Sequence, residues 1–267
     1  MKLKTFYLSL TAALLLSVLA VHAEPFKVPP MGSKESGTMI VDYKDGGTKW
    51  TADWTAEQFT QNDENFLKLT FTGKGLLFPF SENATWVSES IFKAEDSFYP
   101  ISTNSTVKNT SGEIINTDKK TLDLELGTAT FERNNVNGEG SLTETFDFTP
   151  ETLIVEGVFM ALRTFPFQSG DKIKAGFLSN EPELYNVEFK ERGIETVSTP
   201  EGDIECYKVE LVPKLGVLGV FKVFFPKTYF WFTVAPPHSW IKYVGYENGR
   251  NSPEVVMNVV NFKNSGE

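Results

Sequence analysis

Residues 221–240 read FKVFFPKTYFWFTVAPPHSW, and eight of these twenty side chains are Phe, Tyr or Trp. Successive side chains of a β-strand point to opposite faces, so Tyr229 and Trp231 share one face while Phe230 and Phe232 share the other. A strand with one face in water alternates apolar and polar residues, whereas this stretch is apolar on both faces. It therefore predicts a strand whose second face is either covered by other elements or lines a cavity for an apolar ligand.

The same period of two recurs along the chain and predicts a mainly β protein. It places Met39 with Val41 on one face of a strand, and Leu67 with Leu69 on one face of another, as is typical of half-buried antiparallel strands. We expect an antiparallel, strongly curved sheet or incomplete barrel. The segment 78–112 is rich in Ser, Thr and Asn and predicts long polar loops.

One segment departs from this period and predicts a helix packed on the sheet at about residues 150–163. Its apolar residues, among them Val158 and Leu162, recur at helical spacing. Thr149 is suited to cap the first turn, where Pro150 is tolerated. An apolar stripe at this spacing usually packs against a core, so we expect a lid over an open end or face of the sheet.

The first 23 residues have the order of a secretory signal peptide. Lys2 and Lys4 precede an apolar run at 6–21, and small residues end at Ala23, where we expect cleavage. The run is sixteen residues long, short of the about 20 that a spanning helix needs. The sequence thus predicts a periplasmic or secreted protein that is soluble after cleavage, with no integral membrane span and one β-rich domain at 24–267. A sub-boundary near residue 149 stays open.

The net charge and the counts of Cys and His argue against several classes of function. Cleavage after Ala23 leaves 23 basic and 35 acidic residues, a net charge of −12, and such a chain repels nucleic acid. Cys206 is the single cysteine and cannot form an internal disulfide, and His238 is the single histidine of the mature chain. Zinc sites need several such ligands, so we predict no metal site and no cofactor. A Cys206–His238 dyad is conceivable, but no residue is predicted to be catalytic and the sequence favours a non-enzyme.

Two segments of the C-terminal half carry a family resemblance. LRTFPFQSGD at 162–171 has the form LR-x-x-P-x-x-x-GD, and GIETVSTPEGDIECYKV at 193–209 has the form G-x-E-x-V-x-TP-x-G-x-x-x-C-x-K-V. In these segments the chain resembles a bacterial cell-envelope family known as a domain of unknown function. The resemblance implies a secreted β protein and assigns no catalytic residue.

These observations favour a soluble periplasmic binding or carrier protein for an apolar or amphipathic envelope molecule, such as a lipid. The predicted pocket is lined by aromatic residues of the opening stretch, with the helix as lid. Two alternatives stay open: a polysaccharide-binding or glycoside-hydrolysing protein that uses Trp50, Trp54, Trp86 and Trp240, and a structural envelope component that acts through protein contacts. The predicted ligand-binding residues are Phe224, Tyr229, Phe230, Trp231, Phe232, His238 and Trp240.

Overall fold

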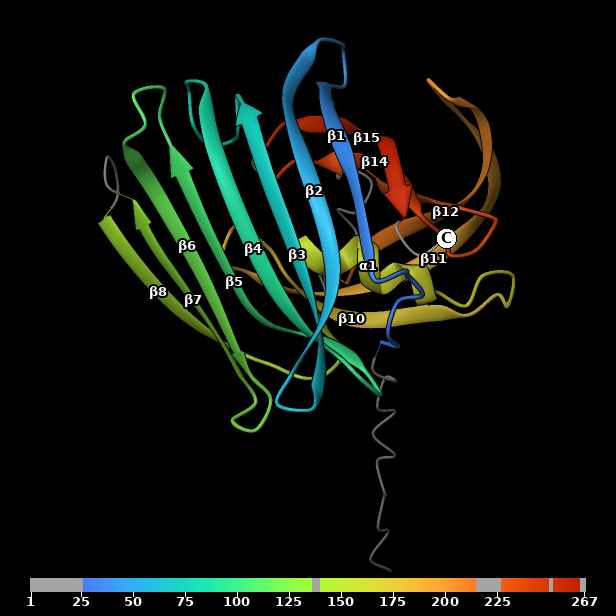
Figure 1. Ribbon diagram of the computed structural model, residues 1–267, viewed down its shortest axis with the longest axis horizontal. Helices are drawn as coiled ribbons and strands as arrows, with labels where there is room; N and C mark the ends of the chain where they lie inside the picture. The colour runs from blue at the N-terminus through green and yellow to red at the C-terminus, as the bar shows by residue number, and fades with distance from the viewer. Residues whose placement is uncertain (1–25, 136–139, 215–226, 250–251, 265–267) are drawn as a thin grey trace, which may run out of the picture.

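The computed structural model describes residues 26–135, 140–214, 227–249 and 252–264, so the predicted signal peptide lies outside the described residues. The described chain forms one sheet of fifteen strands, and β9 and β10 are its one parallel pair (Figure 1). The mainly β class is therefore confirmed. The strands are β1 Lys34–Tyr43, β2 Thr48–Gln61, β3 Glu64–Gly75, β4 Ala84–Ala94, β5 Phe98–Lys108, β6 Ile114–Asp123, β7 Thr128–Asn135, β8 Gly140–Asp147, β9 Thr152–Ile154, β10 Lys172–Leu178, β11 Leu184–Thr199, β12 Gly202–Pro213, β13 Thr228–Thr233, β14 Trp240–Tyr246 and β15 Glu254–Asn264.

The sheet consists of two meanders joined along a single strand pair. Strands β1 to β8 follow one another as neighbours, strands β9 to β15 do the same, and β1 pairs with β15. The two edge strands, β8 and β9, are consecutive in the chain and are separated only by residues 148–151. Because four residues span little distance, the two edges must lie near each other, which requires a strongly curved sheet. The edges do not pair, so the sheet stays open.

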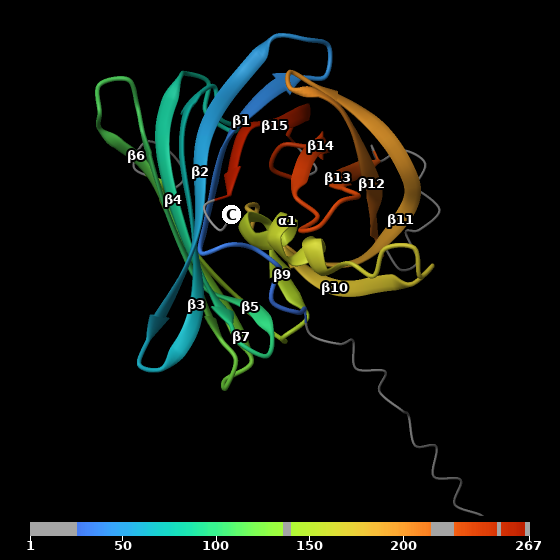
Figure 2. The same cartoon turned by 45° about the vertical axis from the view of Figure 1, so that its right-hand side comes forward.

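The predicted helix is present but is shorter and lies deeper than expected. It comprises the 3-10 turn η1 (Val155–Gly157), α1 (Val158–Ala161) and the 3-10 turn η2 (Leu162–Thr164), while Thr152–Ile154 form strand β9. All four residues of α1 are buried, which fits its lack of a polar face. Both ribbon views place α1 inside the curve of the sheet, so it forms part of the interior rather than an outer lid (Figures 1 and 2).

A buried ion pair fastens this helical segment to the first strand. The Arg163 guanidinium donates to both carboxylate oxygens of Glu35 on β1, at 2.6 and 3.0 Å, and its Nε donates to the carbonyl of Pro237. The side chains of Arg163 and Glu35 are 2% and 0% exposed. The pair therefore links the helix, β1 and the turn before β14 at one buried point.

Segment 78–112 differs from the loop prediction, because β4 and β5 occupy most of it. Some of its small polar side chains face the interior: Ser88, Ser90 and Thr103 are buried. Threonine is common in strands, and small hydroxyl side chains pack well on a pleated surface once a neighbouring strand supplies the backbone hydrogen bonds. The residue types predict a loop, whereas the tertiary pairing produces two eleven-residue strands.

Strand β13 answers the question posed by the opening stretch. Phe230 and Phe232 belong to the main hydrophobic core. On the opposite face Trp231 packs in a second, smaller cluster with Val197, Cys206 and Ile241. The outer face is thus covered by neighbours on the outer surface, whereas the inner face points into the interior of the curved sheet.

Candidate functional site

A cavity of about 410 Å³ lies within the curve of the sheet, and we call it the central cavity. Both meanders and the helical segment line it: Trp50 and Ser88 come from the first meander, Phe159 from α1, and Phe230 and Tyr243 from the second. The near-closure of the sheet therefore creates the space, because residues far apart in the chain face one another across it.

Part of the cavity lining is aromatic. Trp50 and Trp86 meet edge to face with ring centroids 5.3 Å apart, and Phe159 of α1 packs on Trp240 at 4.9 Å. Such pairs add specific geometry to the burial of apolar area. We call this region the aromatic part of the cavity; it comprises Trp50, Phe71, Trp86, Phe159, Phe230, Trp240 and Tyr243.

A buried carboxylate orients the aromatic part. Glu247 lines the cavity, and its Oε1 accepts hydrogen bonds from Trp50 Nε1 at 2.7 Å and from Lys49 Nζ at 3.0 Å. Lys49 Nζ also lies 2.8 Å from Glu247 Oε2, so the ion pair is complete. The backbone N–H of Phe78 donates to the same carboxylate at 3.3 Å. Glu247 thus fixes both an indole ring and the loop after β3.

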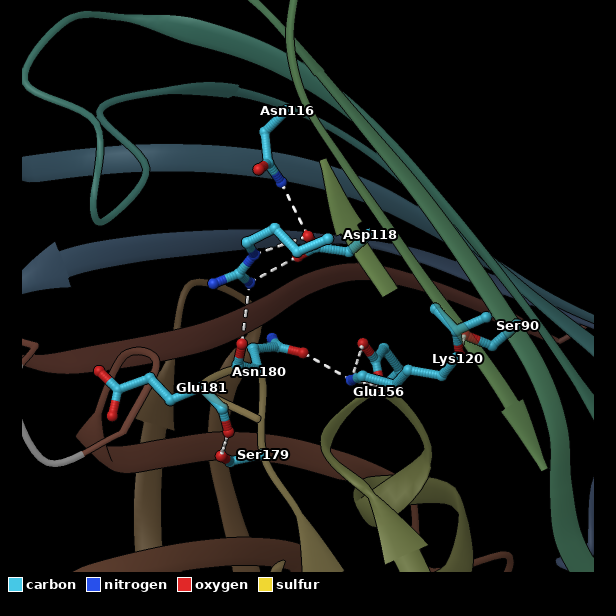
Figure 3. Close-up of polar contacts among 10 residues, drawn as sticks. Ser90, Asn116, Asp118, Lys120, Glu156, Ser179, Asn180 and Glu181 are labelled. Carbon is cyan, nitrogen blue, oxygen red and sulfur yellow. Dashed lines mark hydrogen bonds and ion pairs between the residues drawn. The ribbon is translucent and has the colours of Figure 1, made fainter. Parts of the chain in front are cut away.

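Another part of the cavity lining is polar and contains a lysine whose ammonium protons are all hydrogen-bonded. Lys120 is 1% exposed, and its Nζ donates to both carboxylate oxygens of Glu156, at 2.7 and 3.0 Å, and to Asn180 Oδ1 at 2.7 Å. An ammonium group has three protons, so these three bonds use all of them. Figure 3 shows Lys120 reaching from β6 toward Glu156 on the helical segment and Asn180 after β10.

A second ion pair stands beside the first. Asp118 and Arg133 are cross-strand partners on β6 and β7, and the guanidinium donates from Nε and Nη2 to the two oxygens of Asp118 at 2.8 and 2.7 Å. Arg133 Nη2 also donates to the carbonyl of Asn180 at 2.9 Å. Asn116 Nδ2 donates to Asp118 Oδ1 (Figure 3). Both pairs therefore meet at Asn180, which carries the contact from the first meander to the second.

Small hydroxyl side chains complete this polar lining. Ser88 and Ser105 face each other as cross-strand partners on β4 and β5, and both line the cavity. Thr103 Oγ1 is hydrogen-bonded to Ser90 Oγ at 2.9 Å. We call this region the polar part of the cavity; it comprises Ser88, Thr103, Ser105, Asn116, Asp118, Lys120, Arg133, Glu156 and Asn180.

The structure separates the residues that the sequence predicts as a pocket. Phe230 and Trp240 line the central cavity. Tyr229 and Trp231 point to the outer face, because alternation along β13 directs them away from Phe230. Two more do not line the cavity: Phe232 is packed in the core, and His238 lies in the turn beside Phe167. Phe224 lies outside the described residues.

The structure offers no support for the Cys206–His238 dyad. Cys206 packs in the outer cluster, whereas the His238 ring contacts Tyr207 and Phe167 and its Nδ1 lies 2.9 Å from the carbonyl of Thr233. Burial raises the pKa of the Cys206 thiol to about 11, which disfavours the reactive thiolate. Within the described ranges, no three His, Cys, Asp or Glu side chains are grouped to hold a metal ion. None of the helices in those ranges is long and apolar enough to cross a membrane.

The sequence model of a protein family described as "Protein of unknown function (DUF3108)" matches residues 39–244. The chain belongs to this family. The match extends well beyond the C-terminal segments that carry the resemblance in the sequence. Among curated proteins, none matches the chain.

Three solved structures are similar to this DUF3108 chain at low scores. A Bacteroides fragilis protein with a YmcC-like fold, titled as exported, has 10% identity and a TM-score of 0.35 over 90% of this chain and 100% of its own. A Parabacteroides distasonis protein titled as a lipoprotein has 9% identity and a TM-score of 0.33 over 90% and 100%. The Escherichia coli lipoprotein YmcC has 10% identity and a TM-score of 0.28 over 89% and 90%. Scores this low support no conclusion about this chain.

The motif residues of this DUF3108 chain have architectural positions. Arg163 forms the buried pair with Glu35, and Gly202 begins β12 with a φ of +126°, a conformation that residues with a Cβ rarely adopt. Glu195 accepts hydrogen bonds from Lys208 Nζ at 2.9 Å and from Trp231 Nε1 at 3.0 Å on the outer face. None of these residues lines the central cavity. These motif residues therefore support the architecture, and the side chains that line the cavity come from other positions.

Proposed function

We propose that this protein is an exported binding or carrier protein that holds one apolar or amphipathic envelope molecule in the central cavity. The observation that carries the proposal is the cavity itself, about 410 Å³ in volume and lined by aromatic rings beside a confined polar part. Ligand sites typically have roughly 300–1,000 Å³, mostly apolar walls and a few placed polar groups. A volume near the lower end of that range favours a ligand with a single hydrophobic chain. The signal-like N-terminus supports export.

The polysaccharide alternative has less support. Trp50, Trp54, Trp86 and Trp240 are all buried, so none of the four offers an exposed ring on which a long glycan could stack. Trp54 does not line the cavity and packs instead against Phe159 and Phe262. A purely structural role would need no internal cavity with an aromatic lining, so the cavity favours a carrier over a scaffold.

The first test is uptake of an apolar naphthylamine dye whose fluorescence rises in apolar surroundings. The wild-type mature protein should bind the dye at one equivalent. Ser105→Trp places an indole in the cavity and should abolish uptake, because Ser105 lines the cavity beside Ser88. Asn104→Trp adds the same indole at the preceding, exposed position of β5 and should leave uptake unchanged.

Native mass spectrometry of protein purified from a bacterial envelope, followed by organic extraction, should identify a bound hydrophobe at one equivalent. Thermal melting of both variants confirms that each is folded. If neither the dye nor an extracted molecule binds to the wild type, or if the two tryptophan variants behave alike, the cavity is not a ligand site and the proposal fails.

A further inference from the structure

The charges in the polar part of the cavity cancel. Its four charged side chains form two complete pairs, Lys120 with Glu156 and Arg133 with Asp118. Every ammonium proton of Lys120 already has an acceptor. The guanidinium of Arg133 donates two parallel hydrogen bonds to the carboxylate of Asp118. Within the polar part, no counter-charge is therefore left for an ionic group. The cavity lining also includes Glu183, which is exposed and whose carboxylate would repel an anion.

An ion of either sign would enter at a cost. A phosphate or carboxylate loses its hydration on entering and then faces the carboxylates of Asp118 and Glu156 as well as the cations that they neutralise. An ammonium group also loses its hydration and then faces the cations of Lys120 and Arg133 as well as the carboxylates that neutralise them. Breaking a pair to accommodate an ion would leave its partner buried and unpaired, which is more costly still.

Uncharged hydroxyl groups meet a different surface. The hydroxyls of Ser88 and Ser105 can both donate and accept, and the paired carboxylates of Asp118 and Glu156 keep lone pairs for further donors. Trp86 lies on β4 two residues before Ser88, so the aromatic and polar parts adjoin on a single strand. A ligand could thus contact both parts at once.

We propose that the polar part of the cavity receives an uncharged, hydroxyl-rich head group, of the kind that a sugar or glycerol group provides, while the aromatic part holds the apolar tail. This inference rests on the proposed function and adds the class of ligand. The head group exchanges its hydrogen bonds with water for bonds to side chains that are already neutral as a set.

The test compares three amphiphiles that share a dodecyl tail: dodecyl glucoside, dodecyl phosphate and dodecyltrimethylammonium. Each amphiphile is titrated into the dye-loaded wild-type protein below its critical micelle concentration, and the loss of dye fluorescence measures displacement. Dodecyl glucoside should displace the dye at a concentration at least about tenfold lower than either ion, a difference that one unfavourable charge contact readily produces. Equal displacement by all three, or stronger displacement by an ion, overturns the head-group inference and leaves the proposed carrier function standing. Dye that no amphiphile displaces counts against the carrier function itself.

A charge variant tests the cause of the selectivity. Asp118→Asn removes the negative charge that neutralises Arg133 and should improve dodecyl phosphate relative to dodecyl glucoside by about tenfold. Glu132→Gln is the matched control, because Glu132 pairs with Lys119 on the outer face of the same two strands. The control should keep the wild-type order. If Asp118→Asn also keeps that order, the paired charges do not select the head group. Because the wild-type comparison needs no variant, a misfolded Asp118→Asn protein leaves the test intact.

Discussion

Removing Arg163 should destabilise the protein more than any change to its exposed ion pairs. Arg163→Met leaves the Glu35 carboxylate at 0% exposure with no guanidinium beside it. Breaking a buried pair by deleting one partner costs about 3–5 kcal/mol, because the remaining charge is buried without compensation. The Nε bond to the carbonyl of Pro237 is lost as well, and with it the contact that ties the helical segment to the turn before β14. For a domain of this size, each kcal/mol lowers the melting temperature by about 2–4 °C.

Urea unfolding followed by tryptophan fluorescence measures this loss by linear extrapolation. Lys119→Met breaks the exposed pair with Glu132 and should cost less than about 1 kcal/mol. A double variant, Arg163→Met with Glu35→Leu, should recover most of the stability, because replacing both charges by apolar groups is often neutral. If the single variant is no less stable than Lys119→Met, or if the double variant is no more stable than the single, then an unpaired buried charge is not the cause.

Two further predictions concern a carboxylate and the thiol. Hydrogen bonds from Lys190 and Lys214 lower the pKa of Glu188 to about 2, so its stabilising effect is present above the unfolded pKa of 4.5 and is lost as the pH falls toward 2. Glu188→Gln should therefore lose less stability than the wild type on acidification to about pH 3, measured by urea unfolding; parallel curves would contradict this. Because burial raises the pKa of Cys206 to about 11, Ellman's reagent should leave the native protein unlabelled and react fully in concentrated guanidinium chloride, whereas rapid native labelling would show that the thiol is accessible.

The sequence predicts well which side chains share a face of a strand, but it predicts poorly how the strands pair and how the sheet curves. Alternation correctly assigns Phe230 to one face of β13 and Trp231 to the other, because a period of two is a local property of the backbone. The same reasoning gives no pairing order, so it does not show that β1 joins β15 or that the edges β8 and β9 approach each other. The helix is predicted too long because the apolar spacing runs through Leu153, although residues 152–154 pair with β10.

The polar part of the cavity escapes sequence reasoning for a physical reason. Asn116, Asp118 and Lys120 alternate along β6, but Lys119 between two of them is also charged, so neither face looks like an interior. Lys120 is buried only because Glu156 and Asn180, which are distant in sequence, supply its acceptors. Ser88 and Ser90 follow Trp86 on β4 with a period of two, and that alternation is a local signal that could have marked this strand. On β5 the Ser and Thr residues at 102, 103, 105 and 106 occupy both faces and give no such signal.

The contacts of the motif residues and those of the polar part of the cavity involve different residues. The fold and the ligand specificity can therefore change independently among related chains. Arg163 and Glu195 make their ion pairs and hydrogen bonds outside the cavity lining, so the motif residues can persist whatever ligand is bound. The polar part depends instead on β4 to β7, on Glu156 of the helical segment and on Asn180 after β10, all outside the two motif segments. Exchanging Asp118 or Glu156 for a neutral residue would change the charge balance of the cavity and leave Arg133 or Lys120 without its carboxylate, at a cost in stability but outside the motif contacts. A related chain that keeps the motif and lacks one of these carboxylates should therefore keep the fold at lower stability and favour a negatively charged head group.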